Sequence, residues 1–169
     1  MNRLVILLIA ICAGACASTG ATPRPFPVPG SGSPSRPPGA PTPGAVDGYS
    51  LIGTALALRG VPYRNGGTDP SGFDCSGFVW YVFAQHGVAL PRTVPEQFRA
   101  GRAPRGPLTI GDLVFFSTVA PGPSHVGILI GGDDFVHAPS STGVVRVERL
   151  SAPYWSSRFI GARRPASIP

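Results

Sequence analysis

The chain has 169 residues, enough for one ordinary domain with appended segments. Its net charge of +6 comes from arginine alone, because the sequence contains no lysine. No basic run exceeds two residues and no helix face is basic, which argues against a nucleic-acid-binding protein. A hydrophobic fraction of 43% suits a globular core, and the mildly basic surface is compatible with a carboxylate-rich polymer as partner.

Residues 1–16 have the layout of a secretory signal peptide. Arg3 supplies a short positive start, Leu4–Cys12 is an unbroken apolar run, and small residues follow as far as Cys16. The apolar run is too short for a helix that spans a membrane. We therefore expect this segment to direct export.

The end of the segment also resembles the lipobox of bacterial lipoproteins. In that motif the cysteine, here Cys16, becomes the lipidated first residue of the mature protein. Ala13 departs from the motif, because a larger aliphatic residue is usual there. Ala17 beside the cysteine resembles outer-membrane sorting. The expectation is an outer-membrane anchor facing the periplasm, with cleavage after Ala15 or Ala17 and free secretion as the alternative.

Residues 17–46 contain nine prolines interleaved with glycine, serine and threonine. Such a segment cannot bury enough apolar surface to offset the entropy lost on ordering, so it predicts an extended, solvated tether. The folded domain is expected to occupy 47–166.

The first half of that domain indicates helices. Apolar residues from Ser50 to Arg59, followed by a glycine, predict a short helix. A turn-rich segment runs from Tyr63 to Gly72. A buried helix is then predicted from Cys75 to His86, with Asp74 at the capping position.

The second half indicates strands. Gly101–Gly111 is predicted to be a loop, and short β-type runs punctuated by Gly, Pro and Asp follow it. They are Leu113–Phe116, His125–Ile130, Asp134–His137, Val144–Val147 and Phe159–Ala162. Helices first and an antiparallel sheet afterwards predict the α+β class.

Cys75 is the one cysteine in the globular part, because Cys12 and Cys16 lie in the predicted signal peptide. Exported domains normally pair their cysteines, so a single thiol is either buried and inert or kept for reaction. Thiolate is the nucleophilic form, and a position in the first turn of a helix is expected to lower the pKa of the thiol.

Three histidines are candidates for a general base. His86 stands at the far end of the helix that Cys75 begins, about 16 Å away, and is therefore excluded; capping of the last carbonyls is its expected role. His125 and His137 each lie at the edge of a predicted strand, where a sheet can present them to the helix start. One would accept the thiol proton and the other would orient it.

Four motifs occur together in this chain and in this order. They are Asp74-Cys-Ser-Gly-Phe-Val79, Gly111-Asp-Leu-Val-Phe-Phe116, Ser124-His-Val-Gly-Ile-Leu-Ile-Gly131 and Phe135-Val-His-Ala-Pro139, accompanied by Tyr63 with Gly66-Gly67, Leu90-Pro-Arg-Thr93 with Gln97, and Ala162-Arg-Arg164. Over about residues 48–164 the sequence resembles the NlpC family of bacterial cell-wall cysteine peptidases.

The resemblance implies a papain-like α+β domain in which N-terminal helices pack on an antiparallel sheet of about five strands. It implies a peptidoglycan hydrolase, without a cofactor, that cleaves stem peptides between γ-D-glutamate and a diamino acid. Cys75 would be the nucleophile, His125 the general base and His137 the orienting residue. The residues implied in oxyanion or substrate binding are Tyr63, Asp74, Ser76 and Arg92. A loop-to-domain salt bridge is the alternative role for Arg92.

One departure and several alternatives remain. Asn65 stands where relatives usually have tryptophan, which changes one wall contact and leaves specificity open. The same thiol scaffold could serve an amidase or acyltransferase, or a catalytically silent wall-binding lipoprotein. Cys75, His125 and His137 are also suitable zinc ligands, although no Cys-x-x-Cys pair supports a metal site.

Overall fold

The computed structural model describes residues 46–141 and 143–165. The predicted signal peptide, Cys16 and the tether up to residue 45 lie outside these residues. In chain order the elements are α1 (Gly48–Ala57), β1 (Thr68–Asp69), β2 (Gly72–Phe73), α2 (Cys75–Gln85), α3 (Val94–Ala100), β3 (Leu113–Phe116), β4 (His125–Gly131), β5 (Asp134–His137), β6 (Arg146–Arg149), α4 (Pro153–Ser156) and β7 (Phe159–Arg163).

Five strands form one antiparallel sheet in the order β6-β5-β4-β3-β7. The predicted α+β class and the number of strands are therefore confirmed. β6 begins two residues later than expected because Val144 and Val145 pair elsewhere. Val144 forms an isolated bridge with Pro62, and the Val145 N–H donates to the Val61 carbonyl at 2.8 Å.

The helices begin where capping side chains satisfy their first N–H groups. Asp47 accepts hydrogen bonds from the N–H groups of Tyr49 and Ser50 at the start of α1. Asp74 accepts from the Gly77 N–H at 2.7 Å and caps α2, as predicted. α3, which the sequence analysis left unassigned, starts at a Thr93–Glu96 capping box.

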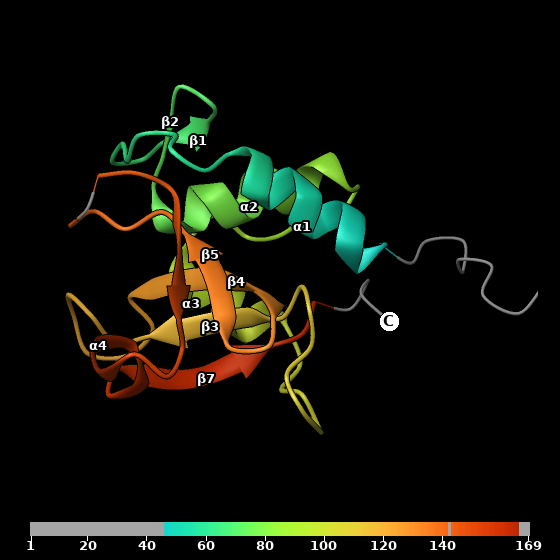
Figure 1. Ribbon diagram of the computed structural model, residues 1–169, viewed down its shortest axis with the longest axis vertical. Coiled ribbons are helices and arrows are strands. Elements are labelled where there is room, and N and C mark those ends of the chain that lie inside the picture. The colour runs from blue at the N-terminus through green and yellow to red at the C-terminus, as the bar shows by residue number, and fades with distance from the viewer. Residues whose placement is uncertain (1–45, 142, 166–169) are drawn as a thin grey trace, which may run out of the picture. The chain divides into compact units, whose positions relative to one another are not determined.

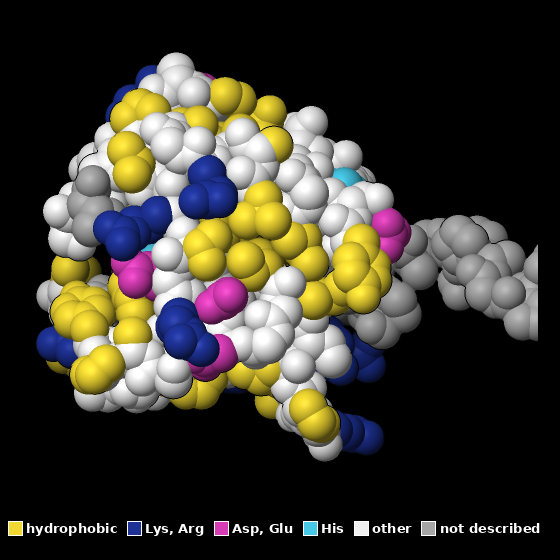
Figure 2. All heavy atoms as spheres, in the orientation of Figure 1, with side chains coloured by type: hydrophobic (Ala, Val, Ile, Leu, Met, Phe, Trp, Pro, Cys, Tyr) yellow, Lys and Arg dark blue, Asp and Glu magenta, His cyan; other side chains and the backbone are white. Residues whose placement is uncertain are grey.

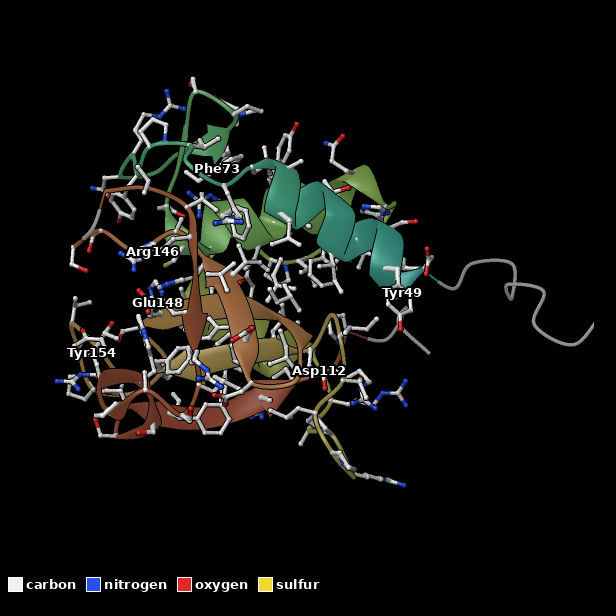
Figure 3. All side chains as sticks on the ribbon, viewed as in Figure 1. Tyr49, Phe73, Asp112, Arg146, Glu148 and Tyr154 are labelled. Carbon is white, nitrogen blue, oxygen red and sulfur yellow. The ribbon has the colours of Figure 1, made fainter. Side chains whose placement is uncertain are left out.

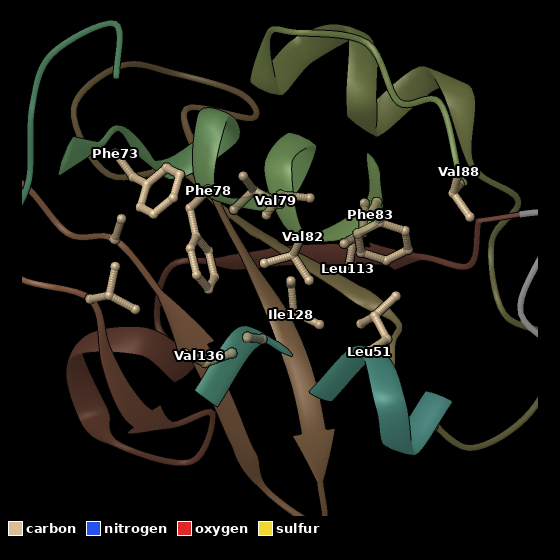
Figure 4. Packing of buried hydrophobic residues seen from close by; sticks show 14 of the residues in the cluster. Leu51, Phe73, Phe78, Val79, Val82, Phe83, Val88, Leu113, Ile128 and Val136 are labelled. Atoms are coloured by element: carbon tan, nitrogen blue, oxygen red, sulfur yellow. The ribbon is translucent and has the colours of Figure 1, made fainter. Parts of the chain in front are cut away.

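The sheet separates two apolar clusters, which we call the first core and the second core. α1 and α2 lie over one face of the sheet, as Figure 1 shows, and Figure 4 shows side chains of the first core between these helices and the strands. The first core includes Phe73, Phe78, Val79, Val82, Phe83, Leu113, Phe115, Val126, Ile128 and Val136. The second core comprises Val114, Phe116, Leu129, Phe135, Trp155 and Ala162.

Strand alternation assigns the side chains to these two cores. On β4, Val126 and Ile128 belong to the first core and Leu129 to the second. Because side chains on a strand alternate between faces, His125 shares its face with Leu129. On β5, His137 likewise shares its face with Phe135 of the second core. Both histidines thus originate on the face turned away from α2.

His86 has a different role from the one expected. Its backbone ends α2, but its Nε2 atom lies 2.9 Å from the hydroxyl of Thr54 on α1. The side chain therefore links two helices rather than capping carbonyls. Among the residues that the structure describes, no helix is long and apolar enough to cross a membrane.

Candidate active site

Cys75 occupies the first position of α2, and the glycines around it allow its helix to approach a neighbouring turn. A Cβ atom on Gly77 would lie 2.0 Å from the Gly67 carbonyl oxygen, and one on Gly67 would lie 2.2 Å from that of Gly72. Side chains at these positions would push the helix start away from the β1–β2 hairpin. The two glycines therefore hold the first turn of α2, and the thiol with it, against that hairpin.

The pKa of Cys75 is raised to about 11, and the expectation of a lowered value is wrong. Burial is the largest cause, because it disfavours the charged thiolate, and the carboxylate of Asp74 adds to it. Hydrogen bonds from the backbone N–H groups of Ser76, Val126 and Cys75 act in the opposite direction. The helix start contributes as predicted, but burial exceeds it. The resting group is a neutral thiol.

The hydrogen bond from the backbone N–H of Val126 to the Cys75 sulfur places the thiol at the beginning of β4. Val126 directly follows His125, so the thiol and His125 meet at the same strand end. The nucleophile thus comes from the first core and the base from the second, and they meet where the sheet ends.

His125 and His137 form a direct pair. The Nε2 atom of His125 lies 2.7 Å from the Nδ1 atom of His137. Nδ1 of His125 is then the nitrogen that remains for the thiol. If it is to accept a proton, Nε2 must carry the hydrogen and donate it to His137, whose own hydrogen is then on Nε2. That Nε2 atom is buried and has no hydrogen-bond partner among the described residues.

Burial keeps both imidazoles neutral. The pKa of His125 is lowered to about 4 by burial. The pKa of His137 is lowered further, by burial first and then by the proximity of the basic groups of His125 and Arg146. At neutral pH the site therefore holds a neutral thiol and a neutral imidazole, a combination suited to general-base catalysis in which proton transfer accompanies attack.

Trp155, which the sequence analysis did not identify, packs against both histidines. Its ring stacks on His125 with centroids 5.5 Å apart and an interplanar angle of 25°. It meets His137 in a T-shaped contact at 4.8 Å. The residue belongs to the four-residue helix α4, too short to produce a periodic pattern, and only tertiary packing brings it to the site.

Gly127 makes room for this packing. A Cβ atom there would lie 2.5 Å from the Phe135 ring and 3.2 Å from the Cβ atom of His137. Gly127 stands between His125 and Leu129 on the same face of β4. Only a residue without a side chain lets the rings from β5 lie across the strand at this point.

A groove of about 630 Å³ lies beside the thiol. It is lined by Asn65, Gly66, Asp74, Ser76, Arg92, Thr93, Val94, Pro95, Ala120, Pro121, Pro123 and Ser124. Asp74 and Ser76 flank Cys75 in the sequence, so the groove borders the start of α2, where the nucleophile stands. Asn65 lines it, as expected for a wall position.

Arg92 lines this groove and is held in place by hydrogen bonds to Asp74 and Ser76. Its NH2 group lies 2.5 Å from one Asp74 oxygen, and its NH1 group lies 3.0 Å from the other and 2.9 Å from the Ser76 hydroxyl. Arg92 therefore makes the salt bridge considered as its alternative role. Its side chain remains 36% exposed and lines the groove.

Tyr63 completes the group around the thiol. The pKa of its hydroxyl is raised, by burial first and then by the nearby acidic groups of Cys75 and Asp74, while the Arg92 guanidinium opposes the rise. Tyr63, Asp74, Ser76 and Arg92 thus lie together, as the sequence analysis anticipated. Within residues 46–141 and 143–165, no three His, Cys, Asp or Glu side chains are grouped to hold a metal ion.

Comparison with known proteins gives the family. Residues 60–164 match the model of the NlpC/P60 family. The chain is 46% identical over 111 residues to Murein DD-endopeptidase MepS/Murein LD-carboxypeptidase of Escherichia coli (strain K12), covering 64% of this chain and 58% of that protein. It is 38% identical over 127 residues to Gamma-D-glutamyl-L-lysine dipeptidyl-peptidase of Bacillus cereus, covering 73% and 37%.

A solved structure supports the same assignment. The crystal structure of an NlpC/P60 family protein from Bacillus cereus superposes with a TM-score of 0.67 at 34% identity, covering 74% of this chain and 41% of that one. The chain thus spans about three fifths or less of the length of these relatives. The matched range 60–164 spans the positions of Cys75, His125 and His137. The chain belongs to the NlpC/P60 family.

Proposed function

We propose that this protein is an exported cysteine endopeptidase that hydrolyses peptidoglycan stem peptides. The observation that carries the proposal is the buried His125–His137 pair, whose Nε2 and Nδ1 atoms lie 2.7 Å apart. The pair lies at the end of β4 that meets Cys75, the first residue of α2. The names of the Escherichia coli and Bacillus cereus relatives, which both describe peptidases, support it. Cys75 is the nucleophile, His125 the general base and His137 the residue that orients it.

The geometry suits an acyl-transfer sequence. Nδ1 of His125 accepts the Cys75 proton as the sulfur attacks the peptide carbonyl carbon. The backbone N–H of Cys75 and the Tyr63 hydroxyl stabilise the oxyanion. His125 then gives the proton to the leaving amine as the C–N bond breaks, and a thioester remains. Water, deprotonated by the same imidazole, hydrolyses the thioester and restores the thiol.

The groove supplies the substrate-binding part of the proposal. Asp74 offers a carboxylate to a substrate amino group, and Ser76 a hydroxyl. Arg92 has N–H groups beyond those that bind Asp74 and can take a substrate carboxylate. The Asp74–Arg92 pair makes this part of the groove neutral overall, so it suits a zwitterionic peptide.

Two bonds compete as the target. We propose the bond between γ-D-glutamate and a diamino acid, in line with the name of the Bacillus cereus relative. Cleavage of D,D cross-links is the second candidate, because MepS, the relative with 46% identity, is named a DD-endopeptidase. Asn65 lines the groove, and its side chain could determine which of the two bonds is cleaved.

Export and anchoring complete the proposal. The apolar run of the leader and Cys16 support a lipoprotein attached to the outer membrane, with residues 17–46 as the tether. A Cys16→Ser variant should leave the membrane fraction and appear in the periplasm or medium. Unchanged fractionation of that variant would contradict the anchor and leave the peptidase proposal intact.

The peptidase proposal is tested with purified sacculi and a defined muropeptide mixture. Wild-type protein should release peptides whose masses identify the γ-D-glutamyl bond as the site of cleavage. The Cys75→Ala variant, with its fold verified by circular dichroism, should release none. Intact stem peptides free of sugar would instead identify an amidase, and undiminished release by Cys75→Ala would exclude the proposed nucleophile.

A further inference from the structure

A second concave surface lies away from the thiol and is strongly basic. A pocket of about 670 Å³ is lined by Arg102, Ala103, Pro104, Arg105, Arg164 and Pro165. It is formed by the segment after α3 and the end of β7. In Figure 1 the α3–β3 connection projects at the lower right, and Figure 2 shows dark-blue side chains on that projection.

The pocket lies at the opposite end of the strands from the histidines. Phe116 at one end of β3 pairs with His125, whereas Leu113 at the other end pairs with Arg163. Three strand residues span about 10 Å. Figure 3 shows the same separation, with Asp112 at one end of the sheet and Arg146, the partner of His137 in the strand register, near the other.

Two arginines of this pocket are paired in a way that ordinary folding does not favour. Arg102 and Arg164 face each other in an isolated antiparallel bridge, with both backbone hydrogen bonds formed at 3.1 and 2.7 Å. Like charges directly opposite each other across such a bridge destabilise it unless a counter-charge is near. Asp112 supplies that counter-charge to Arg164, whereas Arg102 has none among the described residues.

One guanidinium is fixed and two are available. Arg164 binds Asp112 through two hydrogen bonds of 2.8 Å, and Asp112 is fully buried. Arg102 and Arg105 are exposed and form no ion pair or side-chain hydrogen bond with any described residue. Three arginines against one aspartate leave an excess of two positive charges around the pocket.

We propose that this pocket is a secondary binding site for carboxylate groups of peptidoglycan outside the peptide being cleaved. Guanidinium groups bind carboxylates with paired hydrogen bonds, and stem peptides carry carboxylates at regular intervals along the wall. A second contact of this kind raises the local concentration of the enzyme on a polymer without changing its chemistry. The identity of the ligand rests on the proposed function, whereas anion binding does not.

The test measures binding to purified sacculi by co-sedimentation, with the full chain carrying Cys75→Ala so that nothing is cleaved. Adding Arg102→Gln and Arg105→Gln should weaken binding about tenfold at low salt, and the difference should shrink as salt screens the contacts. The control is Arg59→Gln with Arg149→Gln, which removes the same charge from exposed positions elsewhere, although Arg149 lies 3.5 Å from an Asp133 oxygen in an exposed ion pair. Equal binding by all three proteins, or an equal loss in the control, would overturn the proposal.

Chemical treatment of the sacculi identifies the anion. Amidation of the carboxyl groups of the sacculi should remove the difference between the Cys75→Ala protein and the pocket variant, so that both bind equally weakly. Sacculi stripped of phosphate-containing polymers should bind as before. The reverse pattern would assign the pocket to phosphate and contradict the proposal.

A kinetic measurement separates the pocket from the active site. With Cys75 present, Arg102→Gln/Arg105→Gln should cleave a small soluble stem peptide within about twofold of the wild-type rate, yet digest sacculi more slowly. A matching loss on the soluble peptide would show that the arginines act on the active site instead, and would overturn the proposal. Because binding is measured with inactive protein, it can succeed or fail whatever bond the enzyme cleaves.

Discussion

His125 and His137 share a 2.7 Å contact between Nε2 and Nδ1, and this contact determines which nitrogen of His125 can serve the thiol. With Nε2 occupied, Nδ1 is the basic atom, and His137 acts as an acceptor. His137 contributes one lone pair to this arrangement, and its buried Nε2 has no protein partner in the described part of the chain.

Replacing His137 tests the direction of the hydrogen bond. His137→Asn retains an acceptor for the Nε2–H of His125 and should keep kcat within about tenfold of wild type. His137→Ala leaves a buried donor unpaired and should lower kcat by about 10²- to 10³-fold. Steady-state kinetics on a soluble stem peptide measure both values, and KM should change little. If Asn were no better than Ala, His137 would not act as an acceptor.

The pH profile tests the neutral resting pair. As pH falls through about 4, His125 becomes protonated and can no longer accept the thiol proton, so kcat/KM should decline there. As pH rises, no decline from thiol ionisation is expected before about 11. The pH dependence of alkylation of Cys75, with Cys12 and Cys16 replaced by alanine, reports the thiol directly. A midpoint below the ordinary value of 9.0 would contradict the raised pKa.

Gly127→Ala tests the space under the rings. The added Cβ would stand 2.5 Å from the Phe135 ring, so Phe135 and His137 must shift. We expect a loss of about 1–3 kcal/mol in the free energy of unfolding and a reduced kcat. Gly53→Ala on α1 is the matched control, because its Cβ would meet nothing within 4 Å. It should be neutral or stabilise the fold by up to about 1 kcal/mol. Denaturant melts distinguish the two, and equal effects would contradict this account.

Replacing Trp155 tests whether burial keeps His125 neutral. Trp155→Ala opens the site to water, so the pKa of His125 should rise from about 4 towards its usual 6.5, and the acid limb of kcat/KM should move up with it. Trp155→Phe keeps an aromatic surface and should leave that limb near its original position. Thermal melts establish that each variant folds. If Trp155→Ala lost activity without a shift of the acid limb of the kcat/KM profile, Trp155 would have a structural role only.

The sequence predicted the parts of the site that have local signals. Asp74 before an apolar run predicted the cap of α2, and short β-type runs bounded by glycine predicted β3 to β5. The residues missed are those whose importance depends on the third dimension. Trp155 lies in a four-residue helix, and nothing nearby in the sequence links it to His125. β6 is displaced because Val144 and Val145 pair with the segment before β1, a long-range choice that strand propensity does not contain.

The pKa of Cys75 shows the same limit more sharply. The position at a helix start was correct, and its effect has the predicted sign. The net direction is opposite because burial by the surrounding chain and the neighbouring Asp74 carboxylate dominate. The position of Cys75 in the sequence does not reveal how these opposing effects on its pKa add up. Arg92 is similar: its type suggested a carboxylate contact, but only the fold could supply Asp74 as the carboxylate.

The division of the sheet into two cores has a consequence for inhibition. The thiol is supported from the α2 side, whereas its base is supported by Phe116, Phe135 and Trp155 on the other. Small electrophiles need no proton delivered to a leaving amine, but at neutral pH they meet a neutral thiol whose pKa is about 11. Damage to the second core should therefore abolish peptide turnover and slow labelling at neutral pH. Labelling near pH 11, where thiolate forms without the base, should survive, so a molecule labelled at high pH need not be a working one.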